Sequence, residues 1–321
     1  YRLDQATEHA RAGLEIAGQI DDGRGLADAH KALGSIAYYR GKLEAASQFY
    51  ERSLALYREL GDLARTAQAS NNVGDCYRRL GHMDRALERL TEGLELARRI
   101  GDKRDEAVLL YTTGELLLDQ GRWKAAIACL EQALRLAEES GVAISIVEVH
   151  RILGSAYEGV GQLDDGRRHL EIAETLSRDK QQLRFAPRIY LDLARLSATQ
   201  GEFDEASRSI QLALETAGPE PSDEFLGLLH RCRAYLHSRR GEWGDAVVHL
   251  KASLDLLART KLPAEEGRTR LSLGEAYVSR GAEGDGERAR EQWLAALSIF
   301  RQIEARGYVA QVDLRLAEIG S

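Results

Sequence analysis

The sequence contains few of the residues that break regular structure. Only four of its 321 residues are proline, so no proline-rich linker interrupts it. With 44% hydrophobic and 30% charged residues, the composition is that of an ordinary soluble helical protein. This balance argues against intrinsic disorder, which accompanies low hydrophobicity and high net charge.

Cysteine is also scarce, and long hydrophobic runs are missing. The three cysteines, Cys76, Cys129 and Cys232, are odd in number, far apart and without metal-ligand spacing, which suits structural thiols in a reducing cytosol. No apolar run reaches the roughly 18 residues of a membrane span, and the start YRLDQATEHA has no signal-peptide character. Because an initiator methionine is missing too, we expect a cytoplasmic fragment of a larger protein with no membrane partner.

The charge and the motifs that are missing exclude further classes of function. A net charge of −7 argues against a nucleic-acid partner. No Walker-type phosphate loop, HExxH motif or nucleophile elbow is present, so we expect no enzyme and no cofactor. His30, His150 and His230 share one repeat position, but equivalent positions lie at least ~8–10 Å apart, too far for one metal ion with bonds of ~2 Å. We therefore expect packing histidines and no metal site.

A repeat of 40 residues dominates what is present. The first glycine column, which includes two alanines, is Gly34, Gly74, Gly114, Gly154, Ala194, Ala234 and Gly274. The second glycine column, seven residues later, is unbroken: Gly41, Gly81, Gly121, Gly161, Gly201, Gly241 and Gly281. A fixed period of this length predicts a repeat architecture. Since repeats pack on their neighbours, we expect one elongated array over residues 1–321.

Each repeat predicts two helices. In the first repeat, Leu26, Leu33 and Ile36 have helical spacing before Gly41, and Leu43 begins a second apolar helix. The short link makes the helices antiparallel neighbours. Repeats are predicted at 22–61, 62–101, 102–141, 142–181, 182–221, 222–261 and 262–304. Residues 1–20 match the second helix of a repeat that lacks its first, and 308–319 match a terminal capping helix.

Three departures from the period predict local changes. Pro187 stands where other repeats have helix interior, so the first helix of repeat five should begin late or kink. Repeat six should begin at an N-cap, Ser222 or Asp223. Repeat seven carries three extra residues within 281–287, so that Trp293 takes the place expected at 290.

The recurring motif resembles the tetratricopeptide repeat over essentially the whole chain. Pairs such as Val73-Gly74 are followed three residues later by tyrosine, as at Tyr77, and then by Gly-x-(aromatic or Leu)-x-x-Ala. The period of 40 and the Leu/Ile-Gly-Asp motifs at 60–62 and 100–102 look most like the longer variant of kinesin light chains, spindle-orientation adaptors and bacterial signal-transduction ATPases and cyclase-linked regulators. The resemblance implies an all-α, right-handed superhelical solenoid whose first helices line a concave groove.

The groove implied by the resemblance supplies the candidate binding residues. Asn72 is singled out because the matching asparagine in related adaptors contacts the backbone of a bound peptide; a structural hydrogen bond to a neighbouring helix is the alternative. The predicted groove residues are Lys31, Tyr38, Asn71, Asn72, Asp75, Tyr111, Glu115, Arg151, Arg188, Asp192, Arg195, Arg231, Tyr235 and Arg268.

Arginines gather in the later half of this predicted groove. Because arginine presents a rigid fork to a carboxylate, one hypothesis is an acidic peptide segment bound along repeats four to seven. The alternative is that the arginines pair within the groove with Glu148, Glu158, Asp192 and Glu275. On the first hypothesis, repeats four to seven are the better place to look for a partner.

These observations predict a non-catalytic scaffold or sensor that binds a protein or peptide, as the regulatory region of a larger bacterial signalling protein. Two alternatives remain. One is a small-ligand sensor of an ATPase-type transcription regulator, and the other is a structural array that self-associates through its ends.

Overall fold

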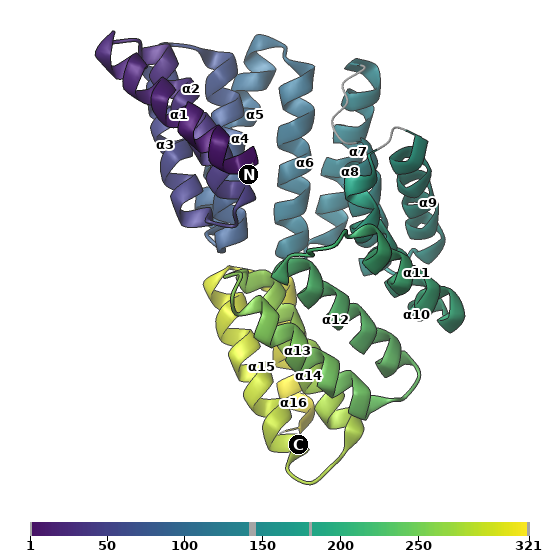
Figure 1. Ribbon diagram of the computed structural model, residues 1–321. Coiled ribbons are helices and arrows are strands. Elements are labelled where there is room, and N and C mark those ends of the chain that lie inside the picture. The colour runs from purple at the N-terminus through teal and green to yellow at the C-terminus, as the bar shows by residue number, and fades with distance from the viewer. Residues whose placement is uncertain (1, 141–145, 180–181, 320–321) are drawn as a thin grey trace. The chain divides into compact units, whose positions relative to one another are not determined.

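The computed structural model describes residues 2–140, 146–179 and 182–319 (Figure 1). Within these ranges the chain forms sixteen α-helices and one short 3-10 helix, and it contains no strand. The predicted all-α repeat array is therefore confirmed. None of the described helices is both long and apolar enough to cross a membrane.

The chain divides into two compact units. Unit 1 consists of Tyr1–Leu116 and Gln132–Ile144, and unit 2 consists of Leu117–Glu131 and Ser145–Ser321. The division runs through α6 (Lys103–Asp119) and α7 (Trp123–Ser140), so each of these helices contributes to both units.

Consecutive helices in each unit pack side by side (Figure 1). Unit 1 contains α1 (Arg2–Gln19), α2 (Gly23–Tyr39), α3 (Leu43–Glu59), α4 (Leu63–Leu80) and α5 (Met83–Ile100). Unit 2 contains α8 (Ile146–Gly159), α9 (Leu163–Asp179), η1 (Leu183–Phe185), α10 (Ala186–Gln200), α11 (Phe203–Thr216), α12 (Asp223–Arg239), α13 (Trp243–Leu257), α14 (Pro263–Arg280), α15 (Asp285–Gln302) and α16 (Arg306–Ile319). In repeats four to six the first helices also meet, since α10 packs on α8 and on α12.

The second glycine column ends the first helix of every repeat. All seven of its glycines adopt the left-handed backbone conformation, with φ between 65° and 83°. Side chains avoid this conformation, whereas glycine enters it without steric cost. The column therefore fixes the tight turn between the two helices of a repeat.

The first glycine column lets those two helices approach each other. A Cβ built on Gly34 would lie 2.6 Å from the Tyr50 ring, and one on Gly74 would lie 2.8 Å from Leu90. Both partners stand 16 residues later. In repeat seven the corresponding partner of Gly274 is Trp293, 19 residues later, which confirms the predicted insertion of three residues.

The other two predicted departures are also confirmed. In repeat five a 3-10 turn, η1, precedes α10, which begins only at Ala186 with Pro187 in its first turn. Proline is tolerated there because the first turn of a helix has no partner for its N–H groups. In repeat six Ser222 is the N-cap, and its hydroxyl accepts a hydrogen bond of 3.2 Å from the N–H of Phe225.

We predict that Gly274→Ala destabilises unit 2. The new Cβ would lie 2.2 Å from Nε1 of Trp293, whose N–H donates a hydrogen bond of 3.1 Å to the Leu271 carbonyl. The indole must move to make room, which should lower the free energy of unfolding by about 1–3 kcal/mol. Urea denaturation followed by circular dichroism measures the loss.

The matched control is Gly286→Ala in α15, where no atom lies within 4 Å of the new Cβ. Its stability should stay within about 0.5 kcal/mol of wild type.

The effect at Gly274 depends on the large Trp293 ring. In repeats five and six the first glycine column carries alanine, and the side chains opposite it are the smaller Ile210 and Leu250. Equal stability of Gly274→Ala and the control would contradict the role assigned to the glycine.

Candidate functional site

All of the predicted groove residues lie on first helices of repeats. We call this set the first-helix face. Its unit 1 part is Lys31 and Tyr38 on α2, Asn71, Asn72 and Asp75 on α4, and Tyr111 and Glu115 on α6. Its unit 2 part is Arg151 on α8, Arg188, Asp192 and Arg195 on α10, Arg231 and Tyr235 on α12, and Arg268 on α14. Arg151 is buried and the other members are half-buried.

In unit 1, Asp75 is the centre of a polar cluster. Its Oδ2 accepts a hydrogen bond of 2.6 Å from the Tyr38 hydroxyl, and its Oδ1 lies 2.8 Å from the Arg78 guanidinium. Arg78 also lies 3.5 Å from Glu115. Burial acts to raise the pKa of Asp75, but the Arg78 charge and the Tyr38 hydrogen bond outweigh it and hold the pKa below its usual value. Asp75 is therefore ionised, and it fixes Tyr38 and Arg78.

Next to this cluster lie two amides without partners. No hydrogen bond joins the Asn71 or Asn72 side chain to another residue in the described part of the chain, and Oδ1 of Asn71 is inaccessible to water as well. An amide side chain can donate and accept hydrogen bonds at once. The structural alternative for Asn72, a hydrogen bond to a neighbouring helix, is not found among the described residues.

In unit 2, the arginines of repeats four and five are already paired. Arg151 lies 2.7 Å from Glu148 and 2.9 Å from Asp192, and Arg195 lies 3.3 Å from Asp192 and 3.0 Å from Glu158. Burial acts to lower the pKa of Arg195, but these carboxylates raise it above its usual value. This network is the internal pairing that the sequence offered as the alternative to ligand binding.

The remaining arginines of the face follow the same pattern. Arg188 pairs with Glu224, Arg231 lies 2.6 Å from Glu265, and Arg268 bridges Glu265 at 2.6 Å and Asp119 at 3.2 Å. Despite its burial, Glu265 has a pKa well below its usual range because Arg231 and Arg268 stabilise its charge. Glu275, the fourth acid expected in these pairs, instead lies 3.1 Å from Arg315.

The Arg268–Asp119 pair belongs to a longer contact within unit 2. The N–H of Gly307 in α16 donates a hydrogen bond of 3.2 Å to the Gln120 carbonyl. The Tyr308 ring stacks on Phe300 and meets the Trp123 indole edge-on. These residues are almost 190 positions apart in the chain, so no local pattern in the sequence could have predicted that they meet.

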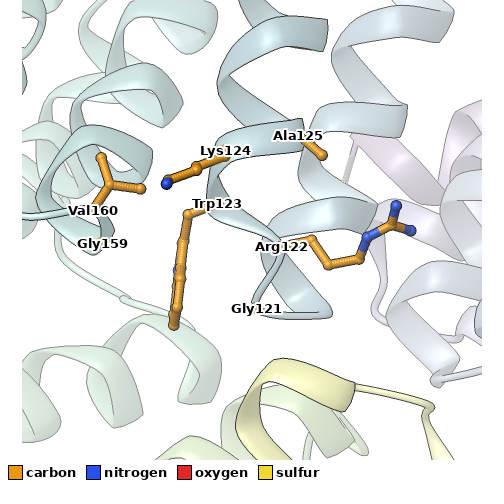
Figure 2. A pocket seen from close by; sticks show the side chains of 7 residues that line it. All are labelled: Gly121, Arg122, Trp123, Lys124, Ala125, Gly159 and Val160. Atoms are coloured by element: carbon orange, nitrogen blue, oxygen red, sulfur yellow. The ribbon is translucent and has the colours of Figure 1, made fainter.

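Trp123 also borders the pocket drawn in Figure 2, a space of about 490 Å³. Its lining residues are Gly121, Arg122, Trp123, Lys124, Ala125, Gly159 and Val160. The Lys124 side chain extends toward Val160, whereas Arg122 turns away from both (Figure 2). None of these residues belongs to the first-helix face, and no motif in the sequence indicates the pocket.

Two of the three histidines that share a repeat position pair with a second histidine of their own repeat. Nδ1 of His150 lies 2.8 Å from Nδ1 of His169, and Nδ1 of His230 lies 2.9 Å from Nδ1 of His249. Burial, with a smaller contribution from His169, lowers the pKa of His150 to about 4. His150 is therefore neutral at pH 7 and can share one proton with His169.

We predict that this pair makes the free energy of unfolding decrease as the pH is lowered from 8 to 5. Because the pKa of histidine in the unfolded chain is about 6.5, the unfolded chain binds more protons than the folded chain between pH 6.5 and 4. At pH 5 His150 alone should cost about 2 kcal/mol relative to pH 8. His150→Leu, which copies Leu110 of repeat three, should lose that part of the pH dependence in urea denaturation. If the pH dependence of stability in His150→Leu equals that of wild type, the histidine pair does not take up a proton on unfolding.

The sequence matches models of one family. Two models described as tetratricopeptide repeat match residues 31–98 and 65–139. No curated protein matches the chain in sequence.

Solved structures share the fold at low sequence identity. The Rap conjugation gene regulator of the plasmid pLS20, in complex with the Phr* peptide, is 18% identical over 90% of this chain and 78% of its own, with a TM-score of 0.71. NprR in complex with its cognate peptide NprX is 15% identical over 84% and 77%, with a TM-score of 0.63. Aspartyl phosphate phosphatase F from Bacillus subtilis is 14% identical over 91% and 75%, with a TM-score of 0.64.

Proposed function

Since the chain is a tetratricopeptide repeat protein, we propose that it is a non-catalytic module that binds an extended peptide segment on its first-helix face. In this proposal the module is the sensor or scaffold region of a larger bacterial signalling protein. It recognises the main chain of the peptide in unit 1, through Asn71 and Asn72.

The observation that carries the proposal is the position of these two amides. They are the only asparagines in 321 residues, and they stand side by side in the interior of α4. Asparagine is a poor residue for a helix interior because its side chain competes for backbone hydrogen bonds. Neither side chain obtains a hydrogen bond from another residue of the described ranges in return. The Asn72 amide can donate to a C=O and accept from an N–H of an extended peptide, whereas Asn71, whose Oδ1 is inaccessible, can only donate.

The similar structures agree with a peptide as the ligand. The pLS20 Rap regulator and NprR are each described in complex with a peptide. We extend this property to the present chain because the fold is shared and because the family resemblance implies that first helices, one of which carries the asparagines, line the binding groove. The Asp75 cluster beside them would fix one edge of the site and offer the Tyr38 ring.

An acidic peptide bound by unit 2 is the second form of the proposal. A ligand carboxylate there would have to compete with Glu265 for Arg231 or with Asp192 for Arg195, and each acid would keep only its second arginine, Arg268 or Arg151. Taking an arginine from an acid in a half-buried site costs free energy that the ligand would have to supply. Main-chain recognition in unit 1 requires no such exchange, and we favour it for this reason.

We predict that Asn71→Ala and Asn72→Ala weaken peptide binding without harming the fold. A phage library of random decapeptides, selected on the wild-type chain, supplies ligands for calorimetry. Loss of a hydrogen bond in the half-buried site should reduce their affinity about tenfold or more. Stability should stay level or rise, because alanine is the better helix former.

A matched control is Gln211→Ala, an exposed amide on α11 in unit 2, which should bind the same peptides as wild type does. Peptides that bind both asparagine variants with wild-type affinity would disprove recognition through these amides.

The acidic form of the proposal has its own test. We predict that simultaneous replacement of Arg188, Arg195 and Arg231 by alanine leaves the affinity of the selected peptides within about twofold, because the arginines hold internal acids. The variant should be less stable, since those acids lose their partners. A large loss of affinity, with peptides enriched in Asp and Glu, would support the acidic form instead.

Self-association and small-ligand sensing give different results in the same assays. Leu3 and Ile16 on α1 and Ile20 directly after it are exposed and could support contacts between chains. Light scattering at increasing protein concentration detects such association without any peptide. If the chain is a small-ligand sensor, the phage selection should yield no peptides that compete with one another for a single site.

A further inference from the structure

Repeat six differs from the other repeats at the turn between α12 and α13. His237 lies in the last turn of α12, Glu242 caps α13, and Asp245 lies in its first turn. Nδ1 of His237 is 2.6 Å from Oε2 of Glu242. One potential ligand atom from each of the three residues lies within 4.8 Å of the other two.

Two more imidazoles adjoin this group. The His249 ring stacks on that of His237, with centroids 5.3 Å apart and an interplanar angle of 21°. On its other side His249 meets His230, at 2.9 Å between the Nδ1 atoms. His237, Glu242 and Asp245 thus lie at the turn, and His249 and His230 continue the row of imidazoles along the helix pair. The 40-residue period relates histidines of different repeats, so it gives no indication of this group within one repeat.

Repeat four provides an internal comparison. It has the same histidine pair in His150 and His169, and Asp165 matches Asp245. Tyr157 takes the place of His237, with its ring stacked on His169, and Gln162 takes the place of Glu242. The histidine pair is thus common to both repeats. Repeat six adds the His237 imidazole and the Glu242 carboxylate, which face each other.

The position of the group suits an ion. Glu242 and Asp245 are exposed and the His237 side chain is 25% exposed, so water can complete a coordination shell. Imidazole with carboxylates is a donor set for divalent transition metals, with bonds of about 2.0–2.2 Å. A metal between Nδ1 and Oε2 would replace the proton that they now share, after both side chains separate slightly.

From this geometry we propose that His237, Glu242 and Asp245 form a binding site for a divalent transition-metal ion such as Zn²⁺. The ion would join the last turn of α12 to the first turn of α13. It would thereby stabilise repeat six, because it binds the folded pair and not the separated helices. The site is independent of the peptide proposed for unit 1.

The test uses the full chain, treated with EDTA and then titrated with Zn²⁺ in a calorimeter or with Co²⁺ by visible absorption. Wild type should bind one equivalent at this site. His237→Tyr and Glu242→Gln, which copy repeat four, should each lower the affinity about tenfold or more. Tyrosine stands in this column in repeats two, four and seven, as Tyr77, Tyr157 and Tyr277, so the first variant should fold.

Repeat four allows the reverse experiment. Tyr157→His with Gln162→Glu would copy the repeat-six ligands beside Asp165 and should add a second equivalent of Zn²⁺. Thermal unfolding in EDTA checks that each variant folds as wild type does. The proposal is overturned if wild type binds no Zn²⁺, or if its binding is unchanged by both repeat-six substitutions.

Discussion

The close approach of the two helices of each repeat is the constraint on which the rest of the structure depends. A large side chain from the second helix, such as Leu90 or Trp293, fills the space left by a missing Cβ on the first. Glycine in the left-handed conformation then turns the chain back within two residues, as Gly81 and Gly201 do. Since both features recur every 40 residues, each repeat presents the same face of its first helix.

The polar contacts between repeats carry the same period. Tyr38 reaches Asp75 across 37 residues, Arg151 reaches Asp192 across 41, and Arg315 reaches Glu275 across 40. In unit 2 these contacts pair the arginines of the first-helix face internally, whereas in unit 1 no described residue forms a hydrogen bond with the side chain of Asn71 or Asn72. Among the described residues the arginines of this face are thus held by ion pairs, and the proposal therefore places the peptide at the two asparagines.

The sequence predicted most of the fold because the fold is set by local rules that repeat. The late start of α10 followed from Pro187, and the insertion in repeat seven followed from the displaced Trp293. The site was less predictable, because ion pairing depends on which side chains meet across helices. Composition alone could not show that Arg231 and Arg268 share Glu265, or that His237 faces Glu242 across a turn. The contact of Gly307 with Gln120 joins residues almost 190 positions apart, beyond the reach of any periodic pattern.

The central claim is that a peptide is recognised by unit 1 through hydrogen bonds to its main chain. Hydrogen–deuterium exchange of the chain, with and without a peptide selected on it, measures this most directly. We expect new protection of backbone amides in α2 and α4, where Tyr38, Asn71 and Asn72 lie, and little change in α10, α12 and α14. Protection confined to α10, α12 and α14 would contradict it and would assign binding to the arginines of unit 2.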